Sequence, residues 1–85
     1  LEVIQMSVKD AVVERFLELC KQRKITQNEL ANISGVTPST VYSMFDKRRR
    51  DISVITIKKL CDGLEISLGT FFSTALFDEL EQEIK

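Results

Sequence analysis

Residues 25–45 read ITQNELANISGVTPSTVYSMF, and the start and stop signals in this stretch predict two short helices joined by a tight turn. Thr26 and Glu29 have the spacing of a capping box, in which each side chain binds the other residue's backbone amide at the start of a helix. Gly35 follows as a stop signal, because glycine readily adopts the left-handed conformation that closes a helix. We therefore expect the first helix to begin after Thr26 and to end near Ile33.

Thr37 and Pro38 mark the start of the second helix. A hydroxyl residue is a favoured N-cap, and proline is tolerated at the first helical position because its missing N–H has no intrahelical partner there. We expect this helix to run from Pro38 to about Phe45. Helical geometry sorts its residues into an apolar side with Val41, Met44 and Phe45, and a polar side with Ser39, Tyr42, Ser43 and Asp46.

Three further helices and no strand are expected in the rest of the chain. Their evidence is apolar residues that recur at helical spacing, with a serine or threonine as the capping residue of the later ones. The predicted fold class is therefore all-α with five helices. The helices are expected at about Val8 to Arg23 (apolar stripe Val12, Val13, Phe16, Leu17 and Cys20, with Arg15 on the opposite side), after Ser53 (Ile57, Leu60, Cys61 and Leu64), and after Ser67 (Leu68, Phe71 and Phe72).

Length and composition exclude several classes of protein. Eighty-five residues, of which 44% are apolar and 29% charged, are typical of one soluble globular domain. The chain has no histidine, so it lacks the commonest general base and the commonest zinc ligand, and we expect no enzyme, no metal site and no cofactor. Cys20 and Cys61 lie on apolar stripes without C-x-x-C spacing, which favours reduced core thiols in a cytoplasmic protein over a disulfide. No stretch predicts a membrane span or a secretion signal.

Charge is distributed unevenly along the chain. The formal net charge is only −1, yet the segment from Lys21 to Lys59 holds nine basic and three acidic residues, a charge of +6, and the remainder carries −7. A basic middle and an acidic tail predict two different faces, and the basic one would suit a polyanionic partner. For the run Lys47 to Arg50, taken alone, ordinary solvated surface is the alternative interpretation.

The predicted pair of short helices has features that favour DNA binding. Most helical hairpins are only packing units, but one with a tight glycine turn and a second helix that is polar outside fits a DNA major groove. Gln27 stands at the start of the first helix, and Lys47 to Arg50 follow the second helix, where phosphates would flank the groove. We therefore expect double-stranded DNA as the partner.

Residues 25–45 resemble the helix-turn-helix of the XRE family, the phage Cro and repressor type, and the similarity extends from about Val8 to Thr74. It implies a five-helix lambda-repressor-like domain and a sequence-specific DNA-binding transcriptional regulator, with recognition helix 38–45 in the major groove. It also implies a homodimer on a two-fold symmetric operator. The matching residues are Thr26, Gln27, Leu30 and Ala31 (the T-Q-x-x-L-A opening), Gly35 and Val36 (the turn), Val41 and Met44 (the recognition-helix core), and Leu60, Leu64, Ile66, Ser67, Leu68, Phe71 and Phe72 (the last two helices).

The resemblance also implies which residues meet DNA. In such proteins the first, second and sixth positions of the recognition helix read base edges, and the leading glutamine of the preceding helix contacts phosphate. With the neighbouring polar and basic residues added, we expect one group to face bases and another to position the domain on the backbone. The base-facing group is Pro38, Ser39, Tyr42 and Ser43, and the phosphate-contacting group is Thr26, Gln27, Thr37, Lys47, Arg48, Arg49 and Arg50.

Four positions depart from the family pattern. Pro38 replaces a frequent glutamine, so no bidentate contact to adenine can come from there, although a thymine methyl could still be contacted. Cys20 and Phe45 replace an arginine–glutamate pair, which predicts apolar packing instead of an ion pair. Glu65 replaces a glycine after the fourth helix, and a left-handed conformation there would cost roughly 1 kcal/mol.

The chain divides into residues 1–7 as an N-terminal extension, 8–74 as the DNA-binding domain and 75–85 as an acidic amphipathic tail. We expect Leu1 to Gln5 to be a non-native addition before a start at Met6. The tail either folds back on its own core or packs against the tail of a second chain, and its acids should keep it away from DNA. The alternative function is a protein-interaction or antitoxin module that acts through this tail. Its apolar residues are Leu76, Phe77, Leu80 and Ile84, and its acids are Asp78, Glu79, Glu81 and Glu83.

Overall fold

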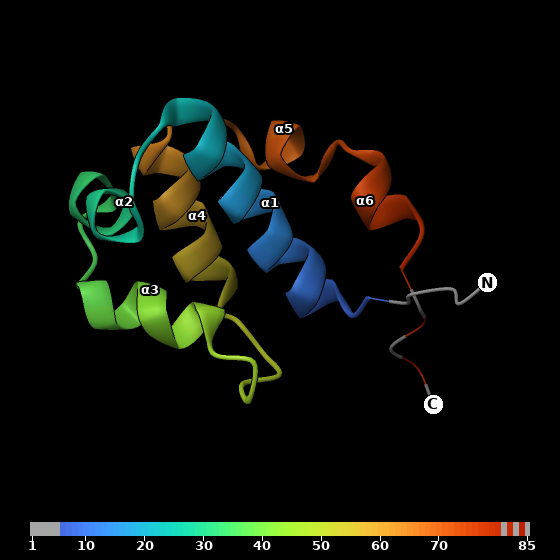
Figure 1. Ribbon diagram of the computed structural model, residues 1–85. Helices are drawn as coiled ribbons and strands as arrows, with labels where there is room; N and C mark the ends of the chain where they lie inside the picture. Colours follow the sequence, from blue (N-terminus) through green and yellow to red (C-terminus); the bar gives the residue numbers. More distant parts are fainter. Residues whose placement is uncertain (1–5, 81, 83, 85) are drawn as a thin grey trace.

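The computed structural model describes residues 6–80, 82 and 84, and within them it contains six α-helices and no strand (Figure 1). Five are the expected helices. The sixth, α6, is a single turn at the start of the tail, and it was not expected as a separate element. The helices are α1 (Val8–Arg23), α2 (Gln27–Ser34), α3 (Pro38–Phe45), α4 (Val54–Gly63), α5 (Leu68–Phe72) and α6 (Ala75–Asp78).

The predicted start and stop signals around α2 and α3 are confirmed. The Thr26 hydroxyl accepts a hydrogen bond from the Glu29 amide at 3.1 Å, and the Glu29 carboxylate accepts one from the Thr26 amide at 3.0 Å. Gly35 ends α2 in the left-handed conformation, with φ of 69°. Thr37 caps α3 by accepting from the Thr40 amide, and Pro38 is its first residue. Local sequence therefore determines where both helices begin and where α2 ends.

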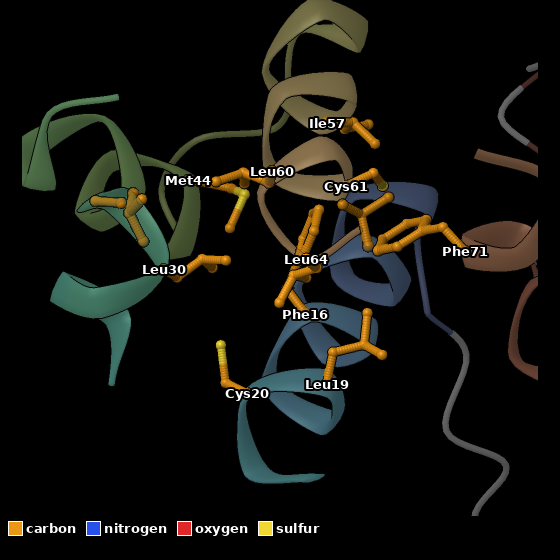
Figure 2. Packing of buried hydrophobic residues seen from close by; sticks show 13 residues of the cluster. Phe16, Leu19, Cys20, Leu30, Met44, Ile57, Leu60, Cys61, Leu64 and Phe71 are labelled. Atoms are coloured by element: carbon orange, nitrogen blue, oxygen red, sulfur yellow. The ribbon is translucent and has the colours of Figure 1, made fainter. Parts of the chain in front are cut away.

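One core joins the first five helices. Phe16 of α1, Leu30 of α2, Val41 of α3, Leu60 of α4 and Phe71 of α5 are fully inaccessible to solvent. Figure 2 shows these elements turning their apolar side chains toward a common interior, with the Phe16 and Phe71 rings 4.5 Å apart. The helix pair α2–α3 is therefore fixed to a single packed body.

The buried face of α1 differs from the expected one. Arg15, expected on the solvent side, is buried, and its Nε donates to the Phe71 carbonyl at 2.8 Å while its Nη2 donates to the Thr70 carbonyl at 3.2 Å. Leu17, expected in the apolar stripe, is 38% exposed. Carbonyl groups near the end of α5 lack intrahelical donors, and Arg15 donates to two of them. These hydrogen bonds compensate for the burial of the Arg15 side chain on the inner side of α1.

The expected departures from the family pattern are present in the structure. Cys20 is buried, and Phe45 packs against the same core, so the two positions are apolar as predicted. Glu65 adopts a left-handed conformation with φ of 59°. Cys20 and Cys61 are both free and buried, and burial raises the pKa of the Cys61 thiol to about 11. Both thiols are therefore core residues.

The first part of the tail packs on the chain's own core. The Phe77 ring centroid lies 5.8 Å from that of Phe71 and 4.8 Å from that of Phe72. This packing agrees with the fold-back alternative for Phe77, whereas Ile84 is 88% exposed. Figure 1 places α6 beside α1, at the opposite end of the molecule from α3. The expectations for Leu1 to Gln5, Glu81 and Glu83 lie outside the described residues.

Candidate nucleic-acid interface

Helix α3 presents a polar outer side. Its buried residues are Val41 and Met44, which face the core. The four residues that the sequence predicts to face bases lie on the side of the helix that is turned away from Val41 and Met44. Pro38, Ser39 and Tyr42 are exposed, and Ser43 is half-buried. The structure therefore brings all four together on one accessible helix. Gln27, the first residue of α2, is half-buried.

The two predicted threonine contacts already have structural partners. The Thr26 hydroxyl accepts from the Glu29 amide, as described above, and the Thr37 hydroxyl lies 3.0 Å from Ser39 Oγ and 2.9 Å from Thr40 Oγ1. A hydroxyl has one donor and two acceptor sites. The Thr26 hydroxyl can therefore cap its helix and still bind a further group. The Thr37 hydroxyl also accepts from the Thr40 amide, so its three sites are already occupied within the protein.

Tyr42 is linked to α2 across the outer surface of the helix pair. Its hydroxyl donates a hydrogen bond to Asn28 Oδ1 at 3.0 Å. Asn28 was not among the predicted site residues, because nothing in the spacing of two residues fourteen positions apart indicates that their side chains meet. Its exposed position in the first turn of α2, next to Gln27, is the signal that could have drawn attention to it.

The basic run after α3 is exposed, but its members are not equivalent. The Arg48 side chain donates to the Asp46 carboxylate from Nε at 3.2 Å and from Nη2 at 3.0 Å, and the Arg48 amide donates to it at 2.9 Å. These bonds from Arg48 lower the pKa of Asp46 to about 2. Lys47, Arg49 and Arg50 form no ion pair within the described part of the chain. Three of the four predicted phosphate-contacting cations are therefore outside any ion pair in the described residues, whereas Arg48 is paired.

Lys9 ties this loop to α1. The Lys9 side chain is buried, and its Nζ donates to the Asp46 carbonyl at 2.8 Å. A cation is favourable at the carboxyl end of a helix, where backbone carbonyls lack intrahelical partners. Lys9 was not among the predicted site residues, because a lone lysine near a helix start is usually exposed.

A hollow of about 450 Å³ separates α3 from the start of α4. Ser43 and Arg49 both contribute to its lining, so one predicted base-facing residue and one predicted phosphate-contacting residue border the same depression. The outer side of α3 is thus continuous with the basic loop. The residues that line the hollow are Thr40, Ser43, Met44, Arg49, Asp51, Ile52, Ser53 and Thr56.

Comparisons with known proteins agree with this geometry. The profile of a family described as helix-turn-helix matches residues 17–71, well over half of the chain. The crystal structure of the prophage Lp1 protein 11 is similar, with a TM-score of 0.77 and 32% sequence identity over 91% of this chain and 100% of that one. A comparison with curated proteins gave no significant match. The chain belongs to the XRE-type helix-turn-helix family, and in general terms it is a DNA-binding regulator.

Across residues 6–80, 82 and 84, no helix has the length and apolar character needed to cross a membrane.

Proposed function

We propose that the protein is a sequence-specific transcriptional regulator that inserts α3 into the DNA major groove. The observation that carries this proposal is the continuous surface formed by the polar side of α3 and the exposed basic loop 47–50 that follows it. An α-helix fits the major groove, and cations beside it lie where the phosphates run.

We assign the contacts as follows. Ser39 and Ser43 offer single hydroxyls to base edges, and Pro38 offers an apolar surface to a thymine methyl. Lys47, Arg49 and Arg50 neutralise phosphates, whereas Arg48 must share its guanidinium with Asp46. Direct readout should be modest, because a serine cannot make a bidentate pair, and DNA shape would supply further specificity.

The proposed functional unit is a homodimer on a two-fold symmetric site. A recognition helix of eight residues spans only a few base pairs, so one domain alone would bind weakly. Two domains on half-sites about one helical turn, roughly 34 Å, apart would combine their contacts. The tail at α6 lies at the opposite end of the molecule from α3, which leaves the proposed DNA surface open (Figure 1).

The test is a binding titration on a DNA site selected from random sequence, repeated over a range of salt concentrations. Each phosphate contact contributes about 0.9 to the slope of log K against log salt. We expect Arg49→Ala and Arg50→Ala each to weaken binding on every sequence and to reduce the slope by about that amount. The matched control is Arg23→Ala, an exposed arginine at the end of α1. Equal slopes for all of these proteins would reject the proposed orientation on DNA.

A further inference from the structure

The hydrogen bond between Tyr42 and Asn28 lies on the outside of the helix pair. Tyr42 is 52% exposed, Asn28 is exposed, and their side chains join the fifth residue of α3 to the second residue of α2. The contact between these helices is already made in the core by Leu30 and Val41, which are fully buried. A solvent-exposed bond adds little to that packing, so a role other than stability has to be considered.

The bond fixes which groups of the Asn28 carboxamide are available. The Tyr42 hydroxyl donates to Oδ1, so the oxygen is held toward α3. The Asn28 Nδ2 carries two N–H donors, and neither has a protein partner among the described residues. The Tyr42 proton is already used, so the tyrosine oxygen can only accept. The pair thus presents two free donors beside the helix that is proposed to enter the groove.

We propose that Asn28 binds DNA through Nδ2 and that Tyr42 is a positioning residue that orients the Asn28 carboxamide. The ligand is a hydrogen-bond acceptor of the DNA, either a phosphate oxygen or the N7 atom of a purine. This inference rests on the proposed function, because it requires α3 to lie in the groove. It adds a DNA contact from α2. It also changes the expected role of Tyr42 from contacting a base to orienting the Asn28 side chain.

The first experiment is a double-mutant cycle in DNA affinity. We expect Asn28→Ala to weaken binding about three- to tenfold, the value of one hydrogen bond. Tyr42→Phe should cause a smaller loss, and this loss should disappear when Asn28 is already alanine. Losses that simply multiply in the double variant would show that Tyr42 does not act through Asn28.

The second experiment separates a direct contact from a merely structural effect. Phosphates in the site are replaced one at a time by neutral methylphosphonates, and purines by their 7-deaza analogues. The wild-type protein should lose affinity at one modified position where Asn28→Ala loses none. A phosphate position identifies a backbone contact, and a deaza position identifies a base contact. Identical loss patterns for the two proteins would overturn the proposal.

Controls keep the outcome interpretable. Asn32→Ala removes the same side chain from an exposed site one turn further along α2, and it should leave DNA affinity unchanged. Thermal midpoints of all variants should agree, since the sites are exposed. If the wild-type protein selects no DNA site, the proposed function fails. If it binds a site and Asn28→Ala binds it equally well, only the inference about Asn28 fails.

Discussion

The buried ammonium group of Lys9 donates a 2.8 Å hydrogen bond to the carbonyl of Asp46, which joins the first turn of α1 to the residue that ends α3. Asp46 also accepts a hydrogen bond from the Arg49 amide on the same carbonyl and three from Arg48 on its carboxylate. The end of the proposed recognition helix and the start of the basic loop are therefore held by one residue, which is itself held by Lys9.

Lys9→Met should lower the free energy of unfolding by about 1 kcal/mol, the usual contribution of one hydrogen bond. Methionine keeps the apolar stem of the lysine, so the change removes mainly the bond to Asp46. Urea unfolding gives the measurement, and Lys59→Met on the exposed side of α4 is the control, expected within about 0.5 kcal/mol of wild type. A Lys9 variant as stable as the Lys59 variant would contradict the prediction.

Asp46→Asn should strengthen DNA binding and steepen its salt dependence, by about 0.9 in slope if Arg48 gains a phosphate. The change removes a negative charge from the basic loop and weakens its hold on the Arg48 guanidinium. Binding isotherms at several salt concentrations measure both effects. In the double variant with Arg48→Ala the gain in slope should vanish. Weaker binding by Asp46→Asn would show instead that the loop needs this carboxylate for its shape.

The same pair fixes the pH dependence of this loop. Hydrogen bonds from Arg48 lower the pKa of Asp46 from 3.8 to about 2. A lowered carboxyl pKa contributes stability above its ordinary value, and this contribution is lost as the pH falls from 3.8 through about 2. At neutral pH the carboxylate stays ionised, so its charge beside Arg48 does not change with pH in that range.

Gly63→Ala should destabilise the fold by about 1–3 kcal/mol, the range for overpacking a close contact. A Cβ at Gly63 would lie 2.8 Å from Ser34 Cα and closer still to Ser34 Oγ, where α2 meets α4. Gly69→Ala in α5 is the matched control, because its Cβ would meet nothing nearer than 3.9 Å. Thermal unfolding compares the two variants. Equal midpoints would show that α2 can shift to accommodate the added Cβ without a loss of stability.

Glu65→Gly should stabilise the protein by roughly 1 kcal/mol, since glycine adopts the left-handed conformation without the steric cost of a Cβ. For a domain of this size that corresponds to about 4–8 °C in thermal midpoint. Glu65→Ala should give no such gain, because alanine keeps the Cβ. A gain shared by both variants would assign the effect to the loss of charge instead.

Local signals in the sequence determined more of the fold than of the site. The boundaries of α2 were predictable from Thr26 and Gly35 because capping and left-handed closure depend on neighbouring residues. The left-handed conformation of Glu65 was predictable on another ground, the resemblance to a family in which this position is usually glycine. Arg15 was placed on the wrong side of α1, because its partners at Thr70 and Phe71 are distant in sequence.

In the candidate site, too, local features were predictable from the sequence and contacts between distant residues were not. Helical spacing was enough to put Ser39, Tyr42 and Ser43 on the outer side of α3. It could not reveal the bond from Tyr42 to Asn28, because that contact depends on how two helices pack across a turn.

Phe77→Ala should lower the thermal midpoint and leave the oligomeric state unchanged. The Phe77 ring is half-buried against Phe71 and Phe72, so its loss should reduce stability by about 1–3 kcal/mol, less than for a fully buried ring. Ile84→Ala is the control, since its side chain is 88% exposed and should contribute little. Sedimentation at several concentrations reports on association. If Phe77→Ala keeps the wild-type midpoint but dissociates a dimer, this part of the tail belongs to an interface between two chains instead of the core of one.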